Sequence, residues 1–348
     1  MKMIIFDVKQ SQQIMDRRKF LNISTGAAVA TGVAGMLPGC AAARAAKAAD
    51  AVNAAVDAKR TAAEASTRSG DPVHIKLGDE AGTPLTMRFL GTGAADWNGR
   101  DDRGELRRLS SVLLDNKVLI DFTPSDKDMI PAGVKPEVIF YTHSHGDHYN
   151  PEAALRIGIK RVYLGATWID RARKDFAETS ERTGLPVPEI TPLFLGDKVT
   201  INGMTITALP ANHATGDLKE QTLIYLIEKQ EVRVMYATDT GGIPAIAARI
   251  VGIDPHAKGK AITGLVMEAT MGLDGDEDFR IFTHSSVGTV LRTTHMLLDK
   301  GRYIPKEGQP VYLTHLARTL HGTQAELDAT LPKPLKAAYD GLEVTFTA

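Results

Sequence analysis

The sequence predicts an α/β protein in which β-sheets are flanked by helices. Short apolar segments rich in β-branched and aromatic residues recur along most of the chain, and segments of helical character lie between them. Several of the apolar segments end in histidine or aspartate. Polar side chains of this kind are therefore expected at the carboxyl ends of strands.

The apolar segments define the expected strands, and the intervening stretches define the expected helices. Strands are expected over residues 85–90, 111–114, 118–121, 136–142, 161–164, 204–209, 222–228, 232–237, 265–268, 311–314 and 342–346. Helices are expected over residues 151–156, 166–183, 243–250, 285–300 and 324–329. The helix at 151 follows Asn150 as N-cap and begins with Pro151, which suits the first helical position.

Composition excludes several classes of protein. With 43% hydrophobic and 24% charged residues, the chain can bury a large core. Its 41 Lys and Arg nearly balance its 42 Asp and Glu, so no basic field indicates a nucleic-acid partner, and a small or singly anionic substrate fits better. Cys40 is the single cysteine, which excludes an intramolecular disulfide and a thiolate zinc site in the folded body.

The first 40 residues resemble an export signal. Arg17 and Arg18 precede Phe20 and a mildly apolar run to Leu37, as in a twin-arginine signal. The run ends in Leu-Pro-Gly-Cys at residues 37–40, which is similar to a lipoprotein signal-peptidase box, while the alanines at 41–43 offer an ordinary cleavage site instead. We expect an exported protein, periplasmic or tethered to the membrane by a lipidated Cys40.

Residues 41–71 are rich in alanine with interspersed charges. This composition favours helix without a wide apolar face, so the segment is interpreted as a tether, with a partner-binding helix as the alternative. A folded domain is then expected over residues 72–348.

Residues 141–148, Tyr-Thr-His-Ser-His-Gly-Asp-His, place three imidazoles and a carboxylate in one short segment. Imidazole and carboxylate suit zinc, manganese or iron, and a loop containing glycine lets alternate side chains converge. His143 and His145 are expected to share one metal, and Asp147 and His148 a second. The alternative is a solvated loop whose histidines cap the following helix.

Three further strand ends carry a candidate ligand, namely His213, Asp239 and His315. Each follows an apolar strand, as the first cluster does. Taken singly, any of them could be a core histidine or a turn aspartate, but together with the first cluster they form a set.

With this set, residues 72–348 resemble the metallo-β-lactamase fold superfamily. The resemblance implies an αββα sandwich of two mixed β-sheets with helices on the outer faces. It implies two divalent metal ions, with zinc favoured and manganese as the alternative. One ion would be held by His143, His145 and His213, the other by Asp147, His148 and His315, and Asp239 would bridge them.

Further motifs resemble the phosphodiesterase-type members, including ribonuclease Z and the cyclic phosphodiesterase of the carbon-phosphorus lyase pathway. They are the glycine turn at 87–95, Arg107-Arg108-x-x-Ser111, Phe282-Thr283-His284 and the segment 338–343. This resemblance implies a metal-bridging hydroxide as nucleophile, Asp147 as part of the catalytic centre and His284 as general acid. His284 could instead cap the helix expected from Ser285.

Some features depart from these relatives. A cysteine-rich zinc loop after the glycine turn is absent from the sequence, and Phe122 follows Asp121 where alanine or cysteine is usual. Trp97 and Phe122 either face the mouth of the pocket or lie in the core. His321 and Arg318 either touch a substrate phosphate or lie on a helical surface.

The expected function is an exported phosphodiesterase with a small phosphate-containing substrate. No nucleic acid is favoured, membrane contact is expected only through the lipid anchor, and a homodimer is left open. Two alternatives remain. One is a carbonyl hydrolase acting on a lactone, thioester or β-lactam, which would not need His284, and the other is a non-hydrolytic metal-binding protein.

Overall fold

The structure is a computed structural model that describes residues 73–77, 83–254, 256, 259–273 and 275–348. The expected export signal, Cys40 and the tether at 41–71 lie outside the described residues. Within the described ranges, no helix combines the length and the apolar character that crossing a membrane requires.

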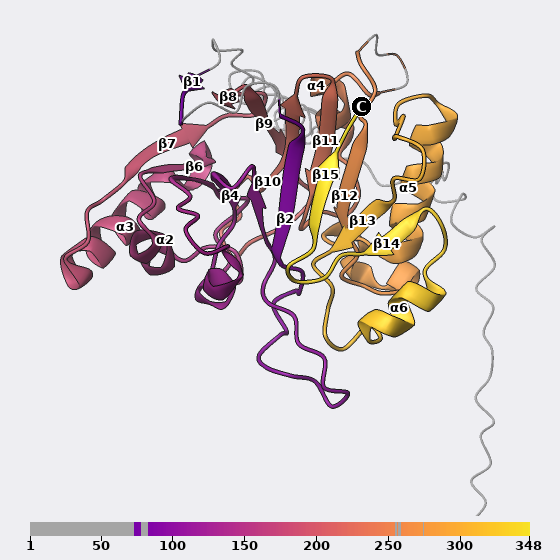
Figure 1. Ribbon diagram of the computed structural model, residues 1–348, viewed down its shortest axis with the longest axis horizontal. Coiled ribbons are helices and arrows are strands. Elements are labelled where there is room, and N and C mark those ends of the chain that lie inside the picture. Colours follow the sequence, from indigo (N-terminus) through magenta and orange to yellow (C-terminus); the bar gives the residue numbers. More distant parts are fainter. Residues whose placement is uncertain (1–72, 78–82, 255, 257–258, 274) are drawn as a thin grey trace, which may run out of the picture. The chain divides into compact units, whose positions relative to one another are not determined.

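Two mixed β-sheets form the centre of the domain (Figure 1). The seven-stranded sheet has the order β15-β2-β3-β4-β5-β6-β7. Its pairs are antiparallel from β15 to β4 and parallel from β4 to β7. In that order the strands are Glu343–Phe346, Leu85–Gly91, Ser111–Leu114, Val118–Ile120, Val138–Phe140, Arg161–Gly165 and Glu189–Leu193.

The eight-stranded sheet has the order β1-β8-β9-β10-β11-β12-β13-β14. Its central pairs from β8 to β11 are antiparallel, and those from β11 to β14 are parallel. In that order the strands are Val73–Ile75, Lys198–Ile201, Met204–Pro210, Leu223–Lys229, Val232–Ala237, Gly264–Glu268, Val311–Thr314 and Leu335–Ala337.

Helices cover the outer face of each sheet (Figure 1). Helices α2 (Pro151–Ile157) and α3 (Ile169–Thr183) pack with the outer side chains of the seven-stranded sheet. Helices α4 (Ala245–Ile250), α5 (Val287–Asp299) and α6 (Gln324–Thr330) pack with those of the eight-stranded sheet. The expected αββα sandwich is confirmed.

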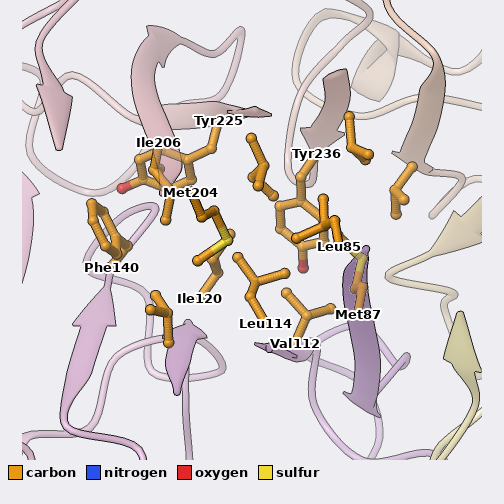
Figure 2. Packing of buried hydrophobic residues seen from close by; sticks show 14 of the residues in the cluster. Leu85, Met87, Val112, Leu114, Ile120, Phe140, Met204, Ile206, Tyr225 and Tyr236 are labelled. Atoms are coloured by element: carbon orange, nitrogen blue, oxygen red, sulfur yellow. The ribbon is translucent and has the colours of Figure 1, made fainter. Parts of the chain in front are cut away.

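The inner faces of the two sheets share one apolar core (Figure 2). Along β5, Val138 and Phe140 point into this core, whereas Ile139 packs under the outer helices. Along β10, Tyr225 points inward and Leu226 outward. Because both faces are covered, these strands appear in the sequence as nearly continuous apolar runs rather than alternating ones.

Side-chain caps set the starts of the helices. Asn150 accepts a hydrogen bond from the backbone of Ala153 at the start of α2. Ser286 caps α5 through the backbone N–H of Thr289, so α5 begins at Val287 rather than at 285. Capping of α5 by His284 is therefore wrong. Short 3₁₀ segments complete the fold: η2 (Pro124–Met129), η3 (Ala166–Trp168), η4 (Gly275–Glu277) and η5 (Phe279–Phe282).

Strand direction decides where the functional side chains gather. Strands β11, β12 and β13 are parallel, and β9 runs the same way because two antiparallel pairings separate it from β11. Their carboxyl ends therefore lie at one edge of the eight-stranded sheet. The loop after β5 meets this sheet, because the Leu223 N–H donates to the Thr142 carbonyl at 2.9 Å and the Tyr225 hydroxyl to the Tyr141 carbonyl at 2.6 Å.

Candidate metal centre

The loop between β5 and α2 carries the His-x-His-x-Asp-His cluster and is held by a buried acid. The carboxylate of Glu220 accepts hydrogen bonds from the Ser144 backbone N–H at 2.7 Å and from its hydroxyl at 2.6 Å. Within the loop, the N–H groups of His148 and Tyr149 both donate to the carbonyl of His145. These hydrogen bonds fix the loop backbone.

Three imidazoles form the first group of candidate ligands. His143 Nε2 lies 2.9 Å from His145 Nδ1, which in turn lies 3.2 Å from His213 Nε2. His213 follows β9 and comes from the other sheet. Tetrahedral zinc with Zn–N bonds of about 2.0–2.1 Å places its ligand nitrogens about 3.3 Å apart. The spacing of these nitrogens fits one such ion.

A second group lies beside the first. His148 Nε2 is 3.2 Å from Asp147 Oδ2 and 3.3 Å from His315 Nε2, and His315 Nε2 is 3.4 Å from the same Asp147 oxygen. Burial raises the pKa of Asp147, but His148 and His315 lower it well below its usual value. Asp147 is therefore an anion and can serve as a ligand.

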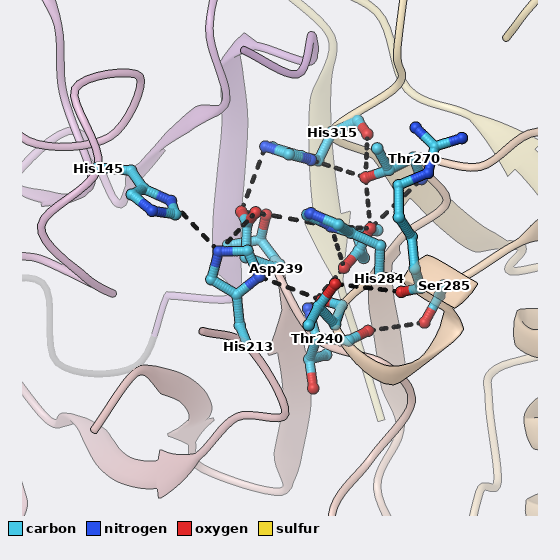
Figure 3. Close-up of polar contacts among 12 residues, drawn as sticks. His145, His213, Asp239, Thr240, Thr270, His284, Ser285 and His315 are labelled. Atoms are coloured by element: carbon cyan, nitrogen blue, oxygen red, sulfur yellow. Dashed lines mark hydrogen bonds and ion pairs between the residues drawn. The ribbon is translucent and has the colours of Figure 1, made fainter. Parts of the chain in front are cut away.

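Asp239 stands between the two groups (Figure 3). Its Oδ2 lies 2.9 Å from His148 Nε2 and 3.3 Å from His315 Nε2, while its Oδ1 lies 3.8 Å from His213 Nε2. Asp239 and His315 both have positive φ, 48° and 53°, which turns each side chain sharply at its strand end. One carboxylate oxygen thus faces each group.

Hydrogen bonds on the outer ring nitrogens turn the inner nitrogens toward the cluster. His148 Nδ1 pairs with Asp121 Oδ2 at 2.8 Å, and His213 Nδ1 with the Thr283 carbonyl at 3.1 Å. Both acceptors require the proton on Nδ1 and leave Nε2 with its lone pair. Outer partners of this kind orient the histidines of metal sites.

Two threonine hydroxyls do the same for His143 and His315. The Thr142 hydroxyl donates to Asp121 and so accepts from His143 Nδ1 at 2.9 Å. The Thr270 hydroxyl donates to Glu268 and accepts from His315 Nδ1 at 2.8 Å. Inner ring nitrogens about 3 Å apart repel one another unless a proton or a metal cation lies between them.

Buried charge also favours a cation at this place. Burial lowers the pKa of His148, but Asp239, Asp147 and Asp121 outweigh it and raise this pKa well above its usual value. Burial and His148 together hold the pKa of His143 well below its usual value. The carboxylates of the cluster therefore stabilise positive charge at this place. The residues present fit divalent metal ions.

His284 lies at the edge of the cluster, and Glu268 holds it there (Figure 3). Its Nδ1 is 3.1 Å from both Glu268 oxygens and 3.8 Å from Asp239 Oδ1, and its ring centre is 4.8 Å from that of His213. Burial lowers the pKa of His284, but the carboxylates of Glu268, Asp239 and Asp147 outweigh it and raise this pKa to about 9.

Three acids that build the site were not among the predicted site residues. Glu268 ends β12 and is fully buried, Asp121 follows β4 and is fully buried, and Glu220 holds the ligand loop. Glu268 and Asp121 could have been found, because each ends an apolar strand as the candidate ligands do. Glu220 stands in a polar stretch, and only its contacts across the fold identify it.

Other candidate residues have structural contacts. Phe122 is fully buried, and Trp97 donates from its indole to the Leu316 carbonyl at 2.7 Å, so both belong to the interior. His321 is buried, its Nε2 donates to the Ala269 carbonyl, and burial lowers its pKa to about 4. Arg318 bonds to the Asn98 side chain and the Arg100 carbonyl.

Fold and cluster together fit a metal-dependent hydrolase. Residues 116–256 match the family model of the beta-lactamase superfamily domain. The resemblance to the metallo-β-lactamase fold is confirmed, and the described part of the chain has that fold. No curated protein matches the sequence.

Several solved structures share the fold. A diphosphatase from the PhnP family is 20% identical, with a TM-score of 0.54, over 76% of this chain and 98% of its own. Zn²⁺-bound PqqB from Methylobacterium extorquens is 14% identical, with a TM-score of 0.55, over 75% and 100%. The short form of human tRNase Z is 16% identical, with a TM-score of 0.52, over 76% and 100%.

Proposed function

We propose that the protein is an exported hydrolase of phosphodiesters that uses two divalent metal ions. The observation that carries the proposal is the pair of His284 and Glu268 beside the candidate ligands. This imidazole belongs to neither ligand group, yet it lies against both His213 and Asp239. A proton donor at this position suits a substrate whose leaving group departs as an alkoxide or phenoxide.

The chain offers one set of donors to each ion. His143, His145 and His213 would hold the first ion, and Asp147, His148 and His315 the second, with one Asp239 oxygen directed to each. Ions held there would supply Lewis-acid chemistry, polarising a phosphoryl oxygen and lowering the pKa of a water molecule. Zinc is favoured because neutral imidazoles dominate the first set, and manganese is the alternative.

Proton movement falls to His284. With Nδ1 donating to Glu268, its Nε2 carries the other proton of the imidazolium. A water molecule that has lost one proton to the solvent forms a bond from its oxygen to phosphorus, the bond from phosphorus to the leaving oxygen breaks, and the His284 Nε2 proton moves to that oxygen. A solvent proton then restores the imidazolium. The anionic Asp147 lies against His148 and His315 in the second ligand group.

The names of two structural neighbours accord with hydrolysis at phosphorus, since one is a diphosphatase and the other a tRNase. The near balance of positive and negative residues favours a small substrate over a long nucleic acid. Export rests on Arg17, Arg18 and Cys40, and we propose a periplasmic or membrane-tethered location from these residues.

The proposal is tested on the purified full chain, loaded separately with zinc and with manganese. Substrates are bis-p-nitrophenyl phosphate, diphenyl phosphate with its more basic leaving group, and a chromogenic β-lactam. We expect His284→Ala to reduce diphenyl phosphate hydrolysis by about 10²- to 10⁴-fold, because a general acid contributes this much, and to affect the nitrophenyl ester less.

His295→Ala is the matched control, because His295 is an exposed histidine on α5. It should leave all rates unchanged. Hydrolysis of the β-lactam but of neither phosphodiester, with no dependence on His284, would replace the proposal by the carbonyl hydrolase. Metal binding without hydrolysis of any substrate would favour a non-hydrolytic protein.

A further inference from the structure

Two large aromatic side chains are exposed in the segment just before His284 in the sequence. Phe279 and Phe282, at the two ends of η5, are 80% and 75% exposed. Most other phenylalanines of the described residues are buried, and Phe122, Phe140 and Phe176 are fully so. Burying a phenylalanine side chain is worth about 1.5–3 kcal/mol, so leaving two of them exposed on one turn calls for an explanation.

The two rings share one face of the turn. A 3₁₀ helix has three residues per turn, so side chains at positions i and i+3 eclipse. Phe279 and Phe282 have this spacing. Both side chains therefore lie on the same side of the turn.

The turn is anchored on both sides. At its start, Asp278 caps it by accepting from the Arg280 N–H, and the two side chains form a bidentate ion pair. At its end, the N–H groups of Thr283 and His284 both donate to the Arg280 carbonyl, at 2.8 and 2.7 Å. The two rings are thus presented from a fixed backbone.

The backbone of the turn packs beside the candidate metal centre. A Cβ on Gly241 would lie 2.4 Å from the Ile281 carbonyl oxygen, so η5 lies directly on the loop that follows Asp239. Thr283, the next residue after Phe282, accepts from His213 Nδ1 through its carbonyl. Phe282 therefore lies between Arg280, whose carbonyl accepts from the His284 N–H, and Thr283, whose carbonyl accepts from His213.

We propose that Phe279 and Phe282 bind an aromatic leaving group of the substrate. This inference rests on the proposed function: if His284 protonates the leaving oxygen, the group attached to that oxygen lies on the His284 side, where η5 stands. Trp97 and Phe122 cannot serve this purpose, since both are buried. The preferred substrates are accordingly phosphodiesters of aryl or other flat, unsaturated alcohols.

The test compares two diesters on the metal-loaded full chain. Bis-p-nitrophenyl phosphate has an aromatic leaving group, and bis-2,2,2-trifluoroethyl phosphate has a small aliphatic one, whose release is followed by ¹⁹F NMR. We expect Phe279→Ala and Phe282→Ala each to lower kcat/KM for the aryl ester by about 2- to 10-fold, the range for one aromatic contact. The trifluoroethyl ester should be unaffected.

Conservative variants and a control sharpen the result. Phe279→Leu and Phe282→Leu keep an apolar side chain, so they should recover part of the aryl preference. Ile304→Ala, at a 61% exposed apolar position in the segment after α5, should change neither rate. Inhibition by phenyl phosphate should weaken in the Phe→Ala variants, which reports binding independently of turnover.

Several outcomes overturn the inference. If the wild type cleaves both esters and the Phe→Ala variants keep its ratio of rates, the phosphodiesterase stands and the aromatic contact fails. If it cleaves neither ester, the proposed function fails and the inference with it. If the variants lose only sedimentation with phosphatidylglycerol vesicles, the rings contact a membrane and not a leaving group.

Discussion

The two sheets contribute to the candidate metal centre in different ways. The seven-stranded sheet supplies four side chains from one loop after β5, within six consecutive positions from His143 to His148. The eight-stranded sheet supplies His213, Asp239 and His315 from the ends of three separate strands. The half from the loop after β5 is thus local in sequence and is called the local half. The other, dispersed half comes together only because β9, β11 and β13 run in the same direction.

Outer partners differ between the halves as well. On the first half, one buried carboxylate, Asp121, serves both His148 and Thr142. On the second half, His213 uses the Thr283 carbonyl and His315 the Thr270 hydroxyl. The outer hydrogen bonds of His143 and His148 thus converge on one carboxylate, while those of His213 and His315 go to two separate neutral groups.

Asp239→Ala should have the largest effect, because this carboxylate faces both groups and its loss affects both halves at once. We expect phosphodiesterase activity to fall by more than the about 100-fold that loss of an outer partner costs, and metal content to fall toward zero. Metal analysis after gel filtration measures this. Asp170→Ala on α3, whose side chain is 97% exposed, is the control, and equal losses in both variants would disprove the assignment.

Removing one ligand from each half separates the two sites. His145→Ala should leave the group of Asp147, His148 and His315 intact, and His315→Ala should leave that of His143, His145 and His213 intact. Each variant should retain about one ion per chain. If either variant retains both ions, the assignment of these ligands to two separate groups is wrong.

Asp121→Asn should cost more than Thr270→Val. The aspartate keeps His148 Nδ1 protonated and raises its basicity, an effect that a neutral amide cannot reproduce. We expect zinc affinity to fall by about 10- to 100-fold in Asp121→Asn and by less in Thr270→Val. Competition with a chromogenic chelator gives both constants, and the reverse order would contradict the contrast between the halves.

A last effect, on stability rather than on metal binding or activity, concerns Asp126 in η2. Burial raises the pKa of Asp126 to about 7, although hydrogen bonds from Thr123 and Ser125 oppose it. A raised carboxyl pKa means that the folded state binds more protons than the unfolded state between about pH 4 and pH 7. Its contribution to stability is present below about pH 4 and is lost as the pH rises to about 7.

Urea unfolding of the chelated wild type and of Asp126→Asn tests this. The free energy of unfolding of the wild type, minus that of the variant, should decrease by on the order of 3 kcal/mol between pH 4 and pH 7 and then level off. Chelation removes the pH dependence of metal binding from the comparison. A difference that rises with pH would show that Asp126 is an ordinary stabilising carboxylate.

Much of the fold follows from local patterns. The strands Ser111–Leu114, Val232–Ala237 and Val311–Thr314 have the expected bounds, because each is a buried apolar run between polar turns. Four strands were not predicted: β1, β7, β8 and β14. Strands β1 and β14 lie at sheet edges and β8 beside one, β7 carries Pro192, and their partly exposed residues give weak apolar runs.

The sequence by itself determined the α/β class, the ligand loop at residues 143–148 and the strand ends at His213, Asp239 and His315, because these depend on local composition and spacing. Tertiary structure alone decided that the strand ends meet the loop, that Glu268 holds His284 and that Glu220 holds the loop. Those contacts join residues far apart in the chain, and only the parallel course of β9, β11, β12 and β13 brings them to one edge.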